Sequence, residues 1–309
     1  MRVLLLVNST ASSVTARGRV VIGKALSADH DVTVAETSRR GHATRLAHAA
    51  ASEGIDVVVV LGGDGTLNEA ANGLAGSRTA LAPLPGGSTN VFARTIGMPD
   101  DPIEACGVLL DALAADSIRR VGLGVVNDRY FLFHVGLGFD AAVVQQVERR
   151  GELKRWMSHA LFGYCAFLTW FAHFDRSRPR FAVTHLDGTT VDDGYFAIAM
   201  NSNPYTYLGT RPFDVIPEAT LDRGLGLVTL RSLDALTLLG VVGSALGRRR
   251  FLQRSRKVDM RTDLRGFSVR GHGPFPYQVD GDYLGEVELL EFSHQPDALA
   301  LVVPPGTSW

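Results

Sequence analysis

The sequence has few cysteines and no long apolar run. Its 309 residues include two cysteines, Cys106 and Cys165, and no Cys/His pair at the spacing of a metal site. We interpret both as small buried residues of a protein in a reducing compartment. No uninterrupted apolar segment reaches the roughly 18 residues that a membrane-spanning helix needs, so we expect none.

The sequence also has no excess of charge. The formal net charge is -1, charged residues are 20% and hydrophobic residues 46% of the chain, an ordinary globular balance. We therefore expect no nucleic-acid partner, and any basic surface has to be local. The start, MRVLLLVNST, has only five consecutive apolar residues. That is too short for a signal peptide, so we expect a cytoplasmic protein or one held peripherally at the inner face of the membrane.

The pattern of the chain changes near residue 120. Over 1–120, strand-like and helix-like segments alternate, and IDVVVVLGG (55–63) is apolar on both faces, as parallel sheets require. These features predict a nucleotide-binding α/β domain with a mostly parallel sheet. Over 121–294, short alternating segments separated by turns predict a β-rich second domain for the substrate. A last strand within 295–309 fits either domain, which leaves open that it completes the first.

The stretch VVLGGDGTLNEAANGL (59–74) places glycines between a buried strand and a helix. Such a turn leaves backbone N–H groups unpaired at the helix start, and glycines let a phosphate approach without meeting a Cβ atom. Thr66 and Glu69, three residues apart, predict a capping box at the start of this helix. A tight turn before a capped helix is the alternative interpretation.

Asp64 lies inside this predicted phosphate cradle. A carboxylate beside phosphates would repel them unless a cation lies between. We therefore predict that Asp64 binds Mg²⁺, directly or through water. The alternative is an aspartate that caps a nearby N–H group.

A second glycine loop, LPGGSTNVFAR (84–94), repeats the order of strand, glycines and helix. Ser88, Thr89 and Asn90 fall at the helix start, and Arg94 lies one turn further, placed to reach phosphate oxygens. Two helix N-termini can thus face one anion. Neither a GxxxxGK[ST] stretch nor a GxGxxG after the first strand occurs. The sequence therefore predicts a nucleoside triphosphate site of another kind.

GGDGTLNE followed by PLPGGSTNVFAR resembles the diacylglycerol kinase catalytic domain, which is shared with sphingosine and ceramide kinases, and above all the soluble bacterial lipid kinases of that family. Weaker similarities follow in the family's order along the chain: ETSRRGHATRLA (36–47), GLGFDA (136–141), NSNPYTYLG (201–209), IPEATLDRGLGLV (216–228) and QVDGDYLG (278–285).

The resemblance implies a nucleotide domain, a C-terminal β-sandwich and an active site in the cleft between them, with ATP and Mg²⁺ as cofactors. Asp64 would help to hold the metal and Arg94 a phosphate. The resemblance and the two glycine loops together give the residues that we expect to bind the nucleotide. These are Asn8, Thr37, Gly62, Gly63, Asp64, Gly65, Thr66, Leu67, Asn68, Ser88, Thr89 and Arg94.

The family's Asp-Gly-Glu motif, which supplies the catalytic base, falls on Asp280-Gly281-Asp282. Its third residue is one methylene shorter here than the usual Glu. Either carboxylate can accept the proton, and we favour Asp282, because Asp280 ends a predicted strand and can cap the turn with its own carboxylate. A β-turn with two solvated acids is the alternative.

Two departures from the family pattern concern metal binding. Many bacterial relatives have Asn-Asp in the second loop, where this chain has Asn90-Val91. Many also have Asp-Asp-Gly at a structural metal site, where this chain has Asp222-Arg223-Gly224. Since Arg223 places a cation where relatives place a ligand, we expect no such metal here.

Two segments fit contact with lipid. Residues 151–180 have an aromatic and apolar middle with basic flanks, which suits an interfacial helix or, alternatively, a helix buried between the domains. RRRFLQRSRK (248–257) has six basic residues and either attracts an anionic leaflet or forms a solvated face.

These observations predict an ATP-dependent lipid kinase of phospholipid metabolism that phosphorylates a lipid hydroxyl at a membrane surface. We favour diacylglycerol, which would give phosphatidic acid. Monoacylglycerol, a sphingoid base and an isoprenoid alcohol remain alternative acceptors. An NAD kinase-like enzyme, which also has Gly-Gly-Asp-Gly, and a non-catalytic lipid- or nucleotide-binding relative remain alternative functions. A homodimer is compatible with the sequence.

Overall fold

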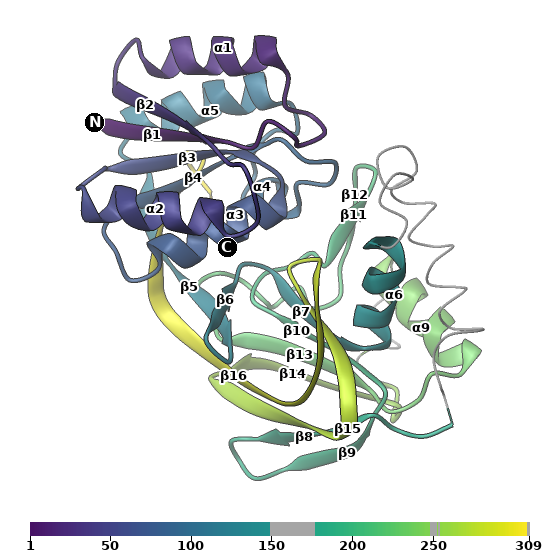
Figure 1. Ribbon diagram of the computed structural model, residues 1–309. Coiled ribbons are helices and arrows are strands. Elements are labelled where there is room, and N and C mark those ends of the chain that lie inside the picture. Colours follow the sequence, from purple (N-terminus) through teal and green to yellow (C-terminus); the bar gives the residue numbers. More distant parts are fainter. Residues whose placement is uncertain (149–176, 248–251, 253, 308–309) are drawn as a thin grey trace. The chain divides into compact units, whose positions relative to one another are not determined.

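The computed structural model describes residues 1–148, 177–247, 252 and 254–307. The chain forms two compact units (Figure 1). Unit 1 comprises Met1–Leu123 and Gln295–Trp309, and unit 2 comprises Gly124–His294. Two segments that were predicted to contact lipid lie partly outside the described residues: most of 151–180, and residues 248–251 and 253 of the basic segment 248–257.

Unit 1 is built on a parallel sheet with the order β4-β3-β1-β2. Its strands are β1 (Arg2–Val7), β2 (Asp31–Glu36), β3 (Val57–Gly62) and β4 (Ala80–Pro85). Every residue of β3 and β4 is buried, which explains why these strands are apolar on both faces. The end of β16 (Asp282–Val302) adds a further parallel strand beside β4, through Ala300 and Leu301.

Helices cover both faces of this sheet, with α1 and α5 on one side and α2 and α3 on the other (Figure 1). Their bounds are α1 (Ala16–Leu26), α2 (His42–Ser52), α3 (Asp64–Leu74), α4 (Val91–Thr95) and α5 (Pro102–Ala114). The sequence analysis did not predict α5, although its start signal is present. Asp101 accepts hydrogen bonds from the N–H groups of Ile103 and Glu104, and Pro102 follows it.

Unit 2 is β-rich, and its strands β14-β13-β10-β7-β15 pair antiparallel in that order. The strands are β5 (Ile118–Val126, starting in unit 1), β6 (Arg129–Phe131), β7 (His134–Gly138), β8 (Phe181–His185), β9 (Thr190–Gly194), β10 (Phe196–Met200), β11 (Thr206–Leu208), β12 (Arg211–Phe213), β13 (Leu225–Leu230), β14 (Val258–Leu264), β15 (Gly266–Val279) and the first part of β16.

The alternation of side chains in β10 divides the interior of unit 2 into two cores. Ala197 and Ala199 belong to one apolar cluster, and Ile198 and Met200 to the other. Two helices that the sequence analysis did not predict, α6 (Phe139–Glu148) and α9 (Ala235–Ala245), contribute to the second cluster. The predicted combination of a parallel α/β unit and a β-rich unit is confirmed. Among the described residues, no helix is both long and apolar enough to cross a membrane.

Candidate active site

The carboxyl ends of the parallel strands in unit 1 bring several predicted nucleotide-binding residues to one edge of the sheet. Asn8 follows β1, Thr37 follows β2 and Gly62 ends β3. The Asn8 amide donates to Thr66 Oγ1 over 2.9 Å, so the end of β1 is linked through side chains to the first turn of α3.

The two glycine loops pack against each other backbone to backbone. A Cβ atom on Gly87 would lie 2.8 Å from the Cα of Gly63, and one on Gly86 would lie 2.8 Å from the nitrogen of Gly62. Neither contact leaves room for a side chain. The glycines therefore permit this loop contact in addition to leaving backbone N–H groups accessible to an anion.

Asp64 joins the first loop to the start of the second helix. Its two oxygens accept hydrogen bonds from the N–H groups of Val91 (2.9 Å) and Phe92 (3.1 Å), at the start of α4. Burial raises the pKa of Asp64, whereas these two hydrogen bonds and Arg94 lower it. The alternative role considered for this residue, capping of a nearby N–H group, is present in the structure, and a metal-binding role remains a prediction.

The capping box predicted from Thr66 and Glu69 is wrong. The helix α3 begins two residues earlier, at Asp64, with Gly63 as its N-cap. The Glu69 carboxylate instead accepts hydrogen bonds from the N–H groups of Gly41 (2.7 Å) and Ala43 (3.1 Å), at the start of α2. Because α2 and α3 pack side by side, a side chain of one helix caps the other.

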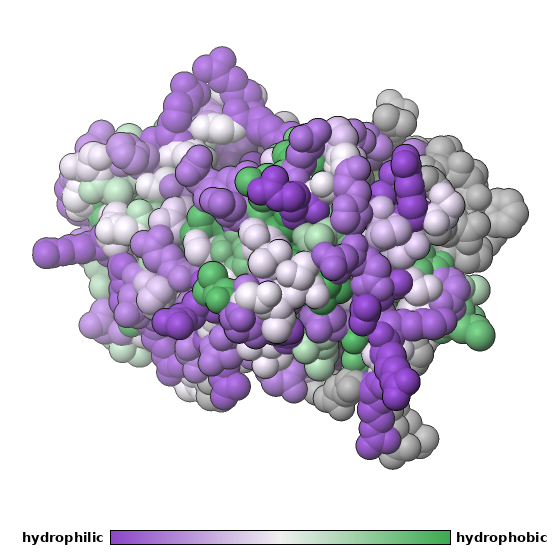
Figure 2. Space-filling model, turned by 90° about the horizontal axis from the view of Figure 1, so that it is seen from below, coloured by the Kyte–Doolittle hydropathy of each residue, from purple (hydrophilic) through white to green (hydrophobic). Residues whose placement is uncertain are grey.

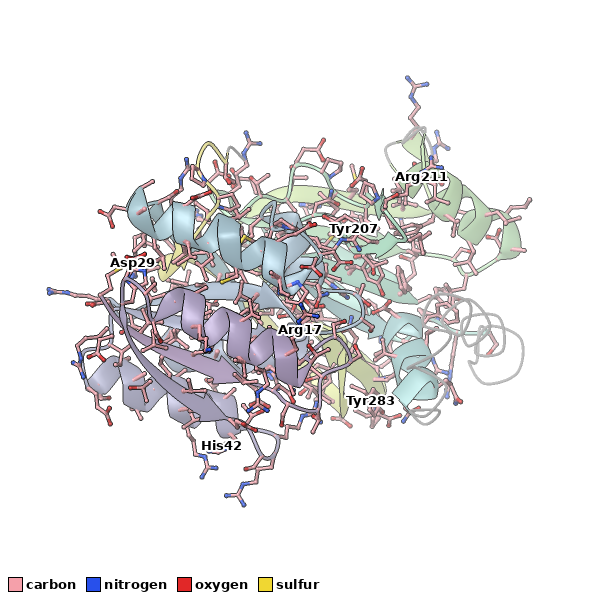
Figure 3. The ribbon with its side chains drawn as sticks, turned by 90° about the horizontal axis from the view of Figure 1, so that it is seen from above. Arg17, Asp29, His42, Tyr207, Arg211 and Tyr283 are labelled. Carbon is pink, nitrogen blue, oxygen red and sulfur yellow. The ribbon has the colours of Figure 1, made fainter. Side chains whose placement is uncertain are left out.

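A pocket of about 210 Å³ lies at this edge of unit 1. Its lining combines three predicted nucleotide-binding residues with five others: Asn8, Thr37 and Thr66, with Thr10, Ser38, Arg39, Arg40 and Glu69. Sequence reasoning missed the two arginines, although they lie in a stretch quoted for the family resemblance. The loop that carries them is held at Ser38, whose N–H donates to Nδ1 of His42 (Figure 3).

Other predicted nucleotide-binding residues do not line this pocket. Leu67 and Asn68 are 4% and 1% exposed, so their side chains face the interior of unit 1. Ser88 is exposed in the second loop, and the carbonyl of Thr89 accepts a long hydrogen bond of 3.5 Å from Arg94. Their nucleotide contacts remain predictions.

The donor set near Asp64 suits Mg²⁺ bound jointly by protein and phosphate. Asp100, which sequence reasoning missed, accepts a hydrogen bond of 2.9 Å from Asn90 in the second loop, and its charge raises the pKa of Asp64 further. Mg²⁺ is usually held by one or two carboxylates together with substrate phosphates. Among the described residues, no group of three or more His, Cys, Asp or Glu side chains could hold a metal without that help.

In unit 2, Asp280 is an internal anchor. It is 5% exposed, and its carboxylate accepts hydrogen bonds from three consecutive backbone N–H groups, those of Leu132 (2.7 Å), Phe133 (3.0 Å) and His134 (3.0 Å). These bonds attach the turn after β15 to the start of β7. The carboxylate therefore stabilises the turn that carries Asp282.

Asp282 is more accessible. Its side chain is 29% exposed, and its Oδ2 lies 3.9 Å from Nη2 of Arg129, at the outer limit of an ion pair. A carboxylate in this position can accept a proton from a substrate more readily than the buried Asp280 can.

The turn before Asp282 is also fixed by a buried chain of hydrogen bonds. The N–H of Gly281 donates to Oε1 of Gln278 over 2.8 Å, which turns the Gln278 amide nitrogen toward Asp140, 2.8 Å away. Tyr205 donates to the other oxygen of Asp140 over 2.6 Å. Burial raises the pKa of Asp140, and these two bonds lower it. Asp140 and Tyr205 lie in two of the weaker family motifs, but the sequence analysis assigned neither of them a role.

Residues 2–126 match the family model of the diacylglycerol kinase catalytic domain. This segment is similar to the catalytic domain of diacylglycerol kinases. The family resemblance predicted from the sequence is therefore confirmed for this segment.

Named relatives share the catalytic domain and, in part, the rest of the chain. A YegS-like lipid kinase of Chromohalobacter salexigens is 35% identical over 154 residues, 48% of each chain. A YegS-like lipid kinase of Pseudomonas aeruginosa strain UCBPP-PA14 is 28% identical over 291 residues, which is 94% of this chain and 90% of the relative. The first match thus spans about half of its relative, and the second most of it.

Solved structures show the same fold at low identity. A diacylglycerol kinase from Bacillus anthracis aligns with a TM-score of 0.73 and 21% identity over 99% of this chain and 98% of that one. An NAD kinase from Archaeoglobus fulgidus in complex with ATP aligns with a TM-score of 0.55 and 11% identity over 99% and 94%.

We expect Asp64→Asn to lower both stability and activity. An Asn side chain presents one oxygen and one NH₂ group to the two N–H donors of α4, so one donor loses its acceptor. The free energy of unfolding should fall by about 1–3 kcal/mol without nucleotide, and kcat by about 100-fold or more. Chemical denaturation and a kinase assay measure the two effects, with the exposed Asp29→Asn (Figure 3) as control. Unchanged kcat in a folded Asp64→Asn protein contradicts the metal role.

We expect Gln278→Leu to lower kcat by about 10-fold to 100-fold and to leave the KM for ATP unchanged, because the Gly281 N–H loses its acceptor and Asp282 is less well positioned. Tyr205→Phe removes only the far bond of the chain and should have a smaller effect. If Gln278→Leu lowers stability but keeps normal kcat, the chain of hydrogen bonds has only a structural role.

We expect His134 to make unit 2 less stable in mild acid. Burial lowers the pKa of His134 from 6.5 to about 3, and its ring lies 4.3 Å from that of Tyr205. The unfolded chain therefore binds a proton that the native chain excludes, and stability is lost as the pH falls below 6.5 toward 3. In urea titrations, His134→Phe should lose less stability than the wild type between about pH 7 and about pH 5, unlike the exposed His48→Gln. Equal losses exclude this role.

Proposed function

We propose that this chain transfers the γ-phosphate of ATP to the hydroxyl of diacylglycerol, giving phosphatidic acid and ADP. In this reaction the bond between the γ-phosphorus and the β,γ-bridging oxygen breaks. A bond from the phosphorus to the lipid oxygen forms, and the hydroxyl proton passes to a carboxylate. The observation that carries the proposal is the pair of glycine loops packed around Asp64 within a domain of this family.

Unit 1 would hold the triphosphate. Phosphoryl transfer depends mainly on positioning and on stabilising the charge of the transferred group. The N–H groups of the two loops and the guanidinium of Arg94 are suited to that charge. Mg²⁺, when bound through Asp64, would neutralise part of the phosphate charge.

The pocket beside β1, β2 and α3 supports a site for the rest of the nucleotide. At about 210 Å³ it is smaller than most ligand pockets, so it would take only part of ATP. Arg39 and Arg40 give it a positive lining that suits an anionic ligand, and Thr37 and Thr66 offer hydroxyl groups.

Asp282 is our candidate for the base in unit 2. Its side chain is 29% exposed, whereas the Asp280 carboxylate already accepts three backbone N–H groups in the interior. We assign Asp280 the role of holding the turn, and Asp282 that of accepting the proton.

The lipid acceptor is supported by the names of the relatives, which are lipid kinases and a diacylglycerol kinase. A radiolabelled-ATP assay tests it with diacylglycerol, monoacylglycerol, a sphingoid base and an isoprenoid alcohol dispersed in detergent, and with NAD in parallel. Label in phosphatidic acid supports the proposal. Label in another lipid changes the acceptor, label in NADP favours the NAD kinase alternative, and no labelled product favours a non-catalytic protein.

We expect Asp282→Asn to lower kcat by about 100-fold or more and to leave ATP binding nearly unchanged, because the base acts mainly in the transition state. Asp282→Glu, which has the residue usual in the family, should keep much of the activity. Asp280→Asn should chiefly lower stability, since an NH₂ group would face a backbone N–H. Measurement of kcat, ATP affinity and unfolding for the three variants decides the assignment. Near-normal kcat for Asp282→Asn with an inactive, folded Asp280→Asn would reverse the two roles.

A further inference from the structure

The outward face of α9 is apolar along its whole length. The exposed large side chains of this helix are Leu236 (79% exposed), Leu239 (68%) and Val242 (44%), each three residues after the one before. This spacing places them in one stripe. Figure 2 shows hydrophobic surface at its right-hand edge, the side on which α9 lies in Figure 1.

The polar residues of α9 lie on its inner face. Thr237 and Ser244 are 1% and 2% exposed. Thr237 bonds to the N-cap Asp234 through both its N–H and its hydroxyl, and Ser244 Oγ accepts the N–H of Leu252. The polar groups thus have internal partners, while Leu236 and Leu239 face outward. A helix of a water-soluble surface has the opposite pattern, so the stripe calls for an apolar environment.

Basic residues lie in the chain that follows α9. Two contacts fix the chain that follows α9: Leu252 bonds to Ser244 near the end of the helix, and Lys257 donates to Asp234 at its start, over 2.8 Å. From Leu252, at the end of α9, to Lys257, at its start, the described residues therefore return toward the start of the helix. Arg254 and Arg256, both exposed, lie between these two residues.

A further cation lies at the C-terminal end of α9. The guanidinium of Arg211, in β12, donates to the carbonyl of Leu246, the C-cap of the helix (Figure 3). α9 thus has Arg211 at its C-terminal end, and Arg254 and Arg256 in the chain that returns toward its start. No acidic side chain is among the exposed residues of α9 itself.

We propose that the outer face of α9, with Arg254, Arg256 and Arg211 around it, docks on an anionic lipid bilayer. The leucines would enter the boundary between headgroups and acyl chains, and the arginines would pair with anionic headgroups. The positive charge of these arginines favours a bilayer over a second copy of the chain as the binding partner of this face. Two copies facing each other through this surface would bring like-charged margins together, whereas an anionic bilayer complements both the stripe and its margin.

Co-sedimentation of the full chain with vesicles tests the proposal. Vesicles of phosphatidylcholine mixed with phosphatidylglycerol should bind the wild type, and phosphatidylcholine alone should bind it more weakly. Leu236→Ser with Leu239→Ser should lower the partition coefficient for the mixed vesicles by about 10-fold or more. Leu239→Phe should keep it, since an aromatic ring also enters the interface.

Matched controls separate position from composition. Leu186 is 71% exposed in the turn between β8 and β9, so Leu186→Ser removes an equally exposed leucine elsewhere and should leave binding unchanged. Arg254→Gln with Arg256→Gln should lower binding to mixed vesicles only, whereas Arg45→Gln with Arg78→Gln, two exposed arginines of unit 1, should not. Circular dichroism and thermal unfolding confirm that each variant is folded.

Three results would overturn the proposal. The first is that the wild type does not bind mixed vesicles. The second is that the double leucine variant binds them as the wild type does. The third is that light scattering shows a wild-type dimer and that the double leucine variant is a monomer. The proposal rests on the proposed function in one respect only: a lipid substrate is the reason why the protein would bind a bilayer. Binding is measured without ATP, and the leucine variant should keep its activity on lipid in detergent micelles, so failure of docking and failure of catalysis are distinguishable.

Discussion

The backbone contact between the two glycine loops is the constraint on which unit 1 depends. Because Gly63 and Gly87 touch without side chains, Asp64 comes close enough to accept the first N–H groups of α4. That carboxylate then fixes the second loop relative to the first. The close contact of the two loops also leaves the Asp64 carboxylate at the edge of the sheet. A triphosphate would bind beside this carboxylate only together with a cation.

Unit 2 uses its carboxylates in a comparable way. Asp280 is enclosed by three backbone N–H groups, and Asp140 is held between Tyr205 and Gln278. Both bury charge where hydrogen bonds compensate for the loss of water. The result is a rigid turn that leaves Asp282 as the accessible acid. Two neighbouring acids in one motif thus have different environments, which the motif alone does not distinguish.

The sequence predicted the fold class well because strong local patterns agree with the tertiary structure. Three local patterns predicted structural elements correctly. They are the buried apolar runs of β1, β3 and β4, the glycines after β3 and β4, and the short alternating segments of unit 2. The helices α6 and α9 were not predicted. The apolar stripe of α9 faces outward and its polar residues face inward, so the pattern did not mark a surface helix.

The sequence by itself determined the family resemblance, the two glycine loops and the candidate acids, because those features are local and ordered along the chain. Only the tertiary structure decided how the side chains pair. Glu69 caps α2 instead of its own helix, Asp64 caps α4, and Gln278 orients the turn at Gly281. In each of these hydrogen bonds, the packing of helices, strands and loops brings the donor and the acceptor together. The spacing of residues within one motif therefore does not determine which groups pair. For Gln278 the partner Asp140 is 138 residues away, a separation that no local pattern records.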